Sequence, residues 1–242
     1  MSKPELRLEN GIARVTLRAE ERKNAISRED IGLMTKFLKE ISEKHVKCLI
    51  LTGEGNTFSS GMYLEELTKG DWSKNPISEV CDLIEDLPFI SICFLNGGIY
   101  GGSVEMALSC DFRIGASLVK LKIPAAKFGI HYGVKGIRRC VEVFGLQLSR
   151  KLLFLGHQLN FKDLTENGFL DFYAEDFEGS QIILKNLVGE ITLLSLDAIR
   201  EMKATLNDLR NDSVDLSAEE SRFSYGFKTG IVAQRLKTYK NL

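Results

Sequence analysis

Two short apolar runs and a third strand-like segment, separated by stretches of helical periodicity, limit most strongly the folds open to this chain. Residues 46–51 and 89–95 are nearly continuous in apolar side chains, and the third predicted strand lies at residues 110–114. Such runs are typical of strands that are buried on both faces of a parallel sheet. Helical segments between them favour parallel neighbours joined by right-handed crossovers. The sequence therefore predicts an α/β core.

The beginning of the chain predicts a hairpin followed by an amphipathic helix. Apolar and polar residues alternate on both sides of Asn10-Gly11, a pair that favours a tight hairpin turn. After a charged loop, Ser27 and Asp30 have the spacing of a capping box at a helix start. The apolar face of this predicted helix is formed by Ile31, Met34, Leu38 and Ile41.

From about Ser180 onward the periodicity is helical and ends in a charged helix predicted from Ser217 to Tyr239. We therefore expect an α/β core over residues 1–180 and a C-terminal helical region over residues 181–242. Helices that gather at one end of a core need burial for their apolar stripes, either on that core or on a neighbouring subunit. This arrangement favours an oligomer.

The composition narrows the classes of function. The 242 residues carry a formal net charge of −1 from interspersed charges, without the basic stripe that nucleic-acid binding requires. No segment reaches the roughly 18 consecutive apolar residues of a membrane span, and the first residues lack the apolar core of a secretion signal. The five cysteines lack metal-ligand spacing and predict reduced, buried thiols in a cytoplasmic protein. Three scattered histidines predict no metal site.

A glycine-rich turn follows the second apolar run and leads into a helical segment. Asn96-Gly97-Gly98 and Gly101-Gly102 allow sharp turning and bring bare amides near a ligand. A helix that begins there points free N–H groups and its positive dipole end outward, which stabilises negative charge at Gly102. Glu105, three residues further on, lies on the same helix face. An oxyanion donor and a carboxylate that face one carbonyl indicate enolate chemistry.

Two plainer interpretations of this turn stay open: a phosphate or dinucleotide loop, and a tight turn without function. Its spacing matches neither G-x-G-x-x-G nor G-x-x-x-x-G-K-[ST]. A second glycine-bearing turn, within residues 52–63, follows the first apolar run and also leads into a helical segment. Loops that leave neighbouring parallel strands meet at one sheet edge, so the two turns together offer the two N–H donors that a thioester oxyanion needs.

Several segments, in order along the chain, resemble the enoyl-CoA hydratase/isomerase, or crotonase, family. They are Lys23-Asn24-Ala25-Ile26-Ser27, Leu49-Ile50-Leu51-Thr52-Gly53, Phe58-Ser59-Ser60-Gly61-Met62, Asn96-Gly97-Gly98, Gly101-Gly102-Ser103-Val104-Glu105, Cys110-Asp111-Phe112-Arg113, and Phe128-Gly129-Ile130 followed by Gly133. The resemblance covers roughly residues 5–145. It implies a spiral of ββα units with a helical region that forms a homotrimer or a dimer of trimers.

The resemblance also implies a site. The family's two oxyanion donors map onto the backbone amides of Met62 and Gly102, and Glu105 matches its first catalytic glutamate. The substrate would be an acyl-CoA or acyl carrier protein thioester of fatty acid or polyketide metabolism, with no cofactor beyond the CoA or phosphopantetheine of that thioester. The positions that match the substrate-binding and CoA-binding groove are Lys23, Ala25, Ser60, Tyr63, Leu64, Gly101, Pro124, Ala125 and Gly133. Arg22 is an alternative to Lys23 as a partner of the CoA phosphates, and for both cations a solvated surface position is an equal expectation.

Departures from the family pattern bear on the reaction. Ala125 stands where the family's hydratases carry a second glutamate, so one carboxylate would have to handle both protons of a hydration. This favours isomerisation over hydration, although some family isomerases keep only the second acid. Tyr63 replaces the usual aspartate, and His131 lies in a loop where divergent members place alternative catalytic groups. His131 is therefore a possible alternative catalytic residue, against the simpler expectation of a surface histidine.

Two further hypotheses follow from the same departures. The shortened segment before the final helix and the missing second acid resemble the polyketide-associated branch, whose members decarboxylate or isomerise carrier-bound thioesters. Glu105 argues against this branch, because its decarboxylating members commonly lack that glutamate. Decarboxylation of a glutaconyl-type thioester is the second enzymatic hypothesis, and a non-catalytic thioester-binding subunit is the third.

Overall fold

The computed structural model describes residues 2–69, 73 and 75–239, and the chain divides into two compact units, Met1–Thr192 and Leu193–Leu242. The helix α7 (Phe177–Leu193) ends the first unit. The boundary that the sequence places at residue 180 falls inside this helix. Each unit is described by itself.

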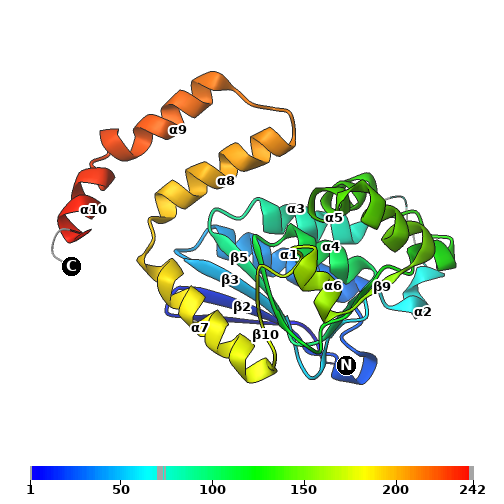
Figure 1. Ribbon diagram of the computed structural model, residues 1–242. Helices are drawn as coiled ribbons and strands as arrows, with labels where there is room; N and C mark the ends of the chain where they lie inside the picture. Colours follow the sequence, from blue (N-terminus) through cyan, green and yellow to red (C-terminus); the bar gives the residue numbers. More distant parts are fainter. Residues whose placement is uncertain (1, 70–72, 74, 240–242) are drawn as a thin grey trace. The chain divides into compact units, whose positions relative to one another are not determined.

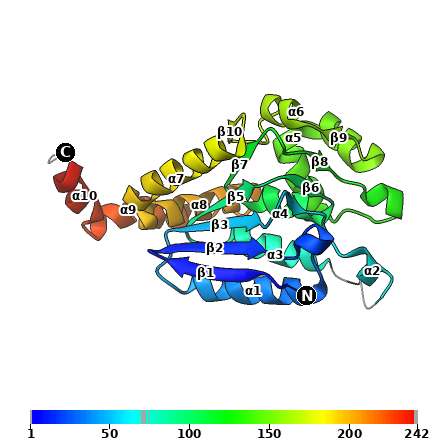
Figure 2. The same cartoon turned by 90° about the horizontal axis from the view of Figure 1, so that it is seen from below.

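The first unit is built on a six-stranded sheet. In spatial order its strands are β1 (Glu5–Glu9), β2 (Ile12–Leu17), β3 (Cys48–Gly53), β5 (Ile90–Leu95), β7 (Phe112–Ala116) and β10 (Phe172–Ala174). β1 and β2 form the predicted antiparallel hairpin, and every later pair in this order is parallel. α7 lies on one side of this sheet and α1 (Arg28–Ser42) on the other (Figures 1 and 2). The α/β core predicted from the apolar runs is confirmed.

A smaller sheet carries the turns of interest. Its strands are β4 (Thr57–Ser59), β6 (Gly98–Tyr100), β8 (Leu121–Lys122) and β9 (Gln158–Leu159), in that spatial order. The remaining helices of the first unit are η1 (Glu20–Arg22), α2 (Leu64–Leu67), α3 (Pro76–Glu85), α4 (Gly102–Ser109), η2 (Ala125–Phe128), α5 (Val134–Leu155) and α6 (Phe161–Glu166). α5 is interrupted at Gly145, where the backbone takes φ 67°. The labels α3, α4 and α5 mark neighbouring helices in both views (Figures 1 and 2).

The core follows the predicted periodicity. Residues 48–52 of β3 and all of β5 are buried. The apolar face of α1 is buried at Ile31, Met34, Leu38 and Ile41, as the sequence predicts. All five cysteines are free and buried. None of the described helices is long and apolar enough to cross a membrane.

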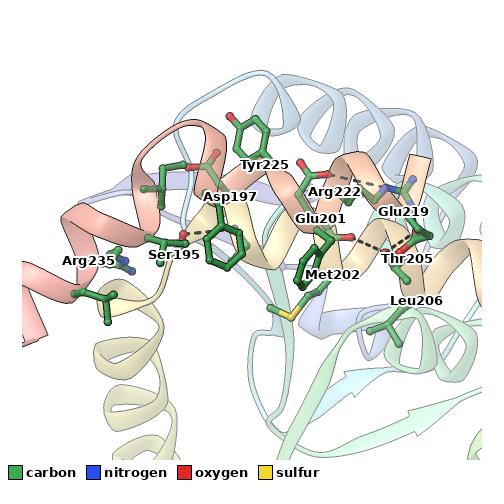
Figure 3. A pocket seen from close by; sticks show the side chains of 17 residues that line it. Ser195, Asp197, Glu201, Met202, Thr205, Leu206, Glu219, Arg222, Tyr225 and Arg235 are labelled. Carbon is green, nitrogen blue, oxygen red and sulfur yellow. Dashed lines mark hydrogen bonds and ion pairs between the residues drawn. The ribbon is translucent and has the colours of Figure 1, made fainter. Parts of the chain in front are cut away.

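The second unit consists of α8 (Leu196–Arg210), α9 (Leu216–Lys228) and α10 (Ile231–Tyr239). The sequence predicts a single helix from Ser217 to Tyr239, and this prediction is wrong, because the chain breaks at Gly230, whose φ is 75°. The three helices line a pocket of about 730 Å³ whose apolar walls include Met202, Leu206 and Phe223 (Figure 3). Across it, Thr205 Oγ1 donates to the Glu219 carboxylate at 2.8 Å.

A capping box joins α1 to the loop before it. The Asp30 amide donates to Ser27 Oγ at 3.1 Å, and the Ser27 amide donates to Asp30 Oδ2 at 2.9 Å. The same Asp30 carboxylate binds Arg22 Nη2 at 2.6 Å. The cap predicted from the sequence is confirmed, and it also holds the loop that leads to Ala25.

We predict that Ser27→Ala lowers the free energy of unfolding by about 1 kcal/mol, the usual cost of losing an N-cap side chain. Urea denaturation followed by circular dichroism measures this change. Ser42→Ala is the matched control, because the Ser42 hydroxyl only donates to the Lys39 carbonyl at the exposed end of the same helix. Equal destabilisation by both changes would contradict the prediction.

Candidate active site

The two glycine-bearing turns leave neighbouring strands of the small sheet. β4 and β6 are parallel, with Thr57 opposite Gly98 and Ser59 opposite Ile99. Ser103, one residue into α4, shares its single O–H between the carbonyl oxygens of Ser59 at 3.0 Å and Tyr100 at 2.8 Å. The turns predicted to converge therefore lie side by side and are joined by one buried serine.

The backbone around Met62 runs beside Ile26 as an isolated parallel bridge. The Ile26 amide donates to the Gly61 carbonyl at 2.8 Å, and the Tyr63 amide donates to the Ile26 carbonyl at 2.9 Å. Because successive amides of an extended segment point to opposite sides, the Met62 N–H is directed away from Ile26.

Gly61 brings this segment against the start of α4. Its φ of +86° suits glycine, and a Cβ built on it would lie 2.5 Å from the Tyr100 carbonyl oxygen and 3.3 Å from the Gly102 nitrogen. Gly102 is the first residue of α4, where helix amides have no partner within the helix. The segment that precedes Met62 therefore passes close to the Gly102 amide, with room for glycine alone at residue 61.

Tyr132 fixes the peptide that carries this amide. Tyr132 Oη donates to the Gly101 carbonyl oxygen at 3.2 Å. The Gly101 carbonyl and the Gly102 N–H belong to one planar peptide and point in opposite directions. Tyr132 therefore orients the Gly102 N–H. Burial raises the pKa of Tyr132 well above its ordinary value, so the phenol stays protonated and can donate.

Glu105 lies one turn into α4 and is 1% exposed. Its Oε1 accepts a hydrogen bond from Ser78 Oγ at 3.0 Å and forms an ion pair with Arg139 Nη1 at 2.6 Å. Burial raises the pKa of Glu105 above its ordinary value of 4.5, although Arg139 and Ser78 act to lower it. Such a group holds its proton more readily than an exposed glutamate does.

Arg139 is the functional neighbour that sequence reasoning missed. It is fully buried on α5, and it contacts carboxylates on both α3 and α4. A signal for it exists in the sequence, because Gly136, Cys140 and Phe144 form a buried face at helical spacing and Arg139 lies beside it. An arginine on such a face needs buried partners.

The other predicted residues of this region lie along the segment from η2 to the start of α5. Pro124 precedes η2, and Ala125 is its first, buried residue. Gly133 caps the start of α5. His131 is exposed, whereas its neighbour Tyr132 points inward, and a catalytic role of His131 stays a prediction.

The residues predicted to form the CoA groove lie on two adjoining segments. The Ser60 amide donates to the Lys23 carbonyl at 2.9 Å, which places residues 22–26 beside residues 60–63. Ala25 is buried, whereas Lys23 and Leu64 are exposed. Arg22, the alternative cation, is bound to Asp30 and lies over the Tyr63 ring at 5.2 Å from the ring centroid.

Comparison with known proteins identifies the family. The family model described as enoyl-CoA hydratase/isomerase matches residues 7–184. The chain belongs to the enoyl-CoA hydratase/isomerase family. The resemblance found in the sequence is therefore confirmed.

Individual relatives agree with this family. An enoyl-CoA hydratase of Alternaria alternata is 27% identical over 208 residues, which cover 85% of this chain and 70% of the relative. An enoyl-CoA isomerase/hydratase of Mycosarcoma maydis is 30% identical over 181 residues, which cover 68% of this chain and 65% of the relative. A solved structure of an enoyl-CoA hydratase/isomerase family protein from Hyphomonas neptunium matches the fold with a TM-score of 0.91 at 22% identity, covering 98% of this chain and 94% of that one.

We predict that Gly136→Ala lowers both the stability and the catalytic turnover of this family member. A Cβ there would lie 2.8 Å from Glu105 Cδ and Oε2 and 2.8 Å from Tyr132 Cε1. Overpacking of this kind costs about 1–3 kcal/mol. Urea denaturation and a turnover assay measure the two effects. Gly189→Ala on α7 is the control, because its Cβ would meet nothing within 4 Å, and a Gly136 variant as active and stable as this control would refute the prediction.

Proposed function

We propose that the chain binds an enoyl thioester of CoA and isomerises or hydrates it through an oxyanion-stabilised enolate. Its carbonyl oxygen would accept hydrogen bonds from the amides of Met62 and Gly102. The observation that supports this most directly is the pairing of β4 with β6, which sets the two turns side by side. Two preorganised donors of this kind stabilise the negative charge that develops on the oxygen.

Glu105 is the proposed proton carrier. In an isomerisation, its carboxylate would take a proton from a carbon of the acyl chain, and the electron pair of that C–H bond would move into the carbonyl as the enolate. The resulting carboxylic acid would then return the proton at another carbon of the conjugated system. The position of Glu105 on α4, one turn after Gly102, supports this role.

The missing second acid favours isomerisation over hydration. Ala125 is buried at the place of the family's second glutamate and offers only a methyl group. Hydration needs one group that deprotonates the water and a second proton transfer to the neighbouring carbon. A double-bond shift needs only one carboxylate, which first accepts a proton and then returns it.

The proposed CoA site follows the two adjoining segments of the groove. Ala25, Ser60 and Leu64 would line the adenine and pantetheine groove beside Tyr63, with Lys23 near the phosphates. The acyl part would lie near Gly101, Pro124, Ala125 and Gly133. The thioester itself supplies the CoA or phosphopantetheine group, and the proposal requires no other cofactor.

Decarboxylation of a glutaconyl-type carrier-protein thioester is the second candidate function. Loss of carbon dioxide leaves its electron pair as the enolate, so the enzyme needs only an acid for reprotonation. Burial raises the pKa of Glu105, and this direction suits a group that acts as an acid.

Oligomerisation and location complete the proposal. Apolar side chains of the second unit, such as Phe223 at 79% exposure and Leu216 at 76%, suit a subunit contact of a homotrimer or a dimer of trimers. Five buried free thiols suit the reducing cytoplasm.

We predict that Gly102→Pro lowers kcat by about 10²–10³, the usual cost of removing one oxyanion donor. Proline suits the first position of a helix and removes the N–H. Gly102→Ala is the matched control, since either side chain places a Cβ 3.2 Å from Ile77 Cγ1, yet alanine keeps the donor. The assay follows double-bond migration in several enoyl-CoAs by mass spectrometry. Equal turnover of the two variants would remove this amide from the mechanism.

The pH dependence of kcat/KM separates the two reactions. Burial raises the pKa of Glu105 above 4.5. Proton abstraction needs the ionised carboxylate, so isomerisation should rise with pH through a midpoint above 4.5. Decarboxylation needs the protonated acid and should fall through the same midpoint, with carbon dioxide released. Glu105→Gln should bind acyl-CoA without turnover, and a variant that keeps both turnover and the pH profile would exclude Glu105.

A further inference from the structure

Arg139 presents its guanidinium to three carboxylates at once. Nε and Nη2 bind the two oxygens of Glu85 at 2.7 and 2.6 Å, Nη2 also binds Asp82 at 2.8 Å, and Nη1 binds Glu105 at 2.6 Å. Lys135 adds a second cation, 2.6 Å from the other Asp82 oxygen. Three carboxylates therefore face two cations in a cluster that α3, α4 and α5 form, buried at Arg139 and Glu105 and open to solvent at Lys135.

The three carboxylates share the donors of Arg139 unequally. Neutralising the charge of the arginine does not by itself require this arrangement. One carboxylate would balance a buried arginine, and Glu85 already supplies a bidentate pair. Glu105 receives one donor nitrogen and binds it through Oε1, the oxygen that also accepts from Ser78. Its other oxygen, Oε2, faces Gly136. The ion pair with Arg139 thus holds Oε1 of Glu105, and Oε2 takes no part in that pair.

We propose that Arg139 is a positioning residue for Glu105, and that Glu85 and Asp82 limit how much of its positive charge acts on Glu105. This inference rests on the proposed function, in which Glu105 carries the proton. Without the α3 carboxylates, Arg139 would hold Glu105 as a permanent ion pair, which is a poor proton donor. Without Arg139, the Glu105 side chain would lose the contact that fixes its direction.

The cysteine and tyrosine side chains near Glu105 stay neutral. Cys81 on α3 and Tyr132 before α5 have pKa values raised well above their ordinary values by burial. Burial also raises the pKa of Cys140, on α5, to about 12. Against burial, Lys135 and Arg139 hold the pKa of Asp82 below its ordinary value, so that carboxylate stays ionised. When the pH passes through the pKa of Glu105, the group that gains or loses a proton is therefore Glu105 and not one of these neighbours.

The proposal predicts shifts of opposite sign at Glu105. Glu85→Gln removes a negative charge and frees part of the Arg139 charge, so the pKa of Glu105 should fall by about 1 unit. Arg139→Gln removes the cation and should raise that pKa by about 1–2 units. A cluster that only supports folding would not shift the Glu105 pKa in opposite directions when its anion Glu85 and its cation Arg139 are replaced in turn.

The experiment is a carbon-13 NMR titration of the full-length protein with labelled glutamate carboxyl groups, in which Glu105→Gln assigns the Glu105 signal. Arg138→Gln and Glu142→Gln are the matched controls, because these two residues pair with each other at 3.5 Å on the same helix. Both controls should leave the Glu105 pKa and turnover unchanged. The pH midpoint of kcat/KM should follow the NMR shift in Glu85→Gln.

Glu85→Gln decides the outcome if Arg139→Gln does not fold, because removing Arg139 leaves buried carboxylates unpaired. An unchanged or raised Glu105 pKa in Glu85→Gln would overturn the proposal. The NMR readout does not depend on turnover. Retained turnover in Glu105→Gln would therefore refute the proposed function, while the two pKa shifts would still test the role of the cluster.

Discussion

The parallel pairing of β4 with β6 is the constraint on which the site depends. These strands have three residues each, and their pairing sets the Gly61 turn against the beginning of α4. The Ser103 hydroxyl bridges the carbonyl oxygens of Ser59 and Tyr100, so the two turns cannot separate without losing a buried hydrogen bond. Backbone amides suit the proposed oxyanion site because a strand pairing fixes the direction of their N–H groups. A side-chain donor would have to lose rotamer freedom.

Burial of Glu105 creates the second requirement, a buried cation. A lone carboxylate that is 1% exposed would take up a proton or destabilise the fold. Arg139 meets this requirement, but it must itself be desolvated, and Glu85 and Asp82 offset that cost. Under the proposed function, the cluster therefore follows from placing one acid beside the oxyanion site in a core. The charges of the cluster decide whether Glu105 is held as an ion or keeps an exchangeable proton.

The features that the sequence predicts well are local or periodic. The Asn10-Gly11 hairpin, the Ser27 capping box and the apolar face of α1 each depend on residues within a few positions of one another. The parallel pairing of the later strands follows from the helical connections between them, and this pairing also predicts that the two turns meet. The predicted helix over residues 217–239 is wrong because a glycine inside a charged helical pattern gives only a weak signal for a break, and Gly230 adopts a positive φ.

The contacts around Glu105 escape the sequence because they join distant elements. Arg139 is separated from Glu105 by 34 positions and from Glu85 by 54, so no local spacing reveals the pair. The clue was a charged residue beside the apolar face of α5, which is ambiguous until the fold places α3 and α4 against it. The absence of a second acid at Ala125 is visible in the sequence, but its consequence is structural. Under the proposed function, both proton transfers fall to the one carboxylate whose orientation Arg139 fixes, and the chemistry of the site becomes that of a single, shared proton.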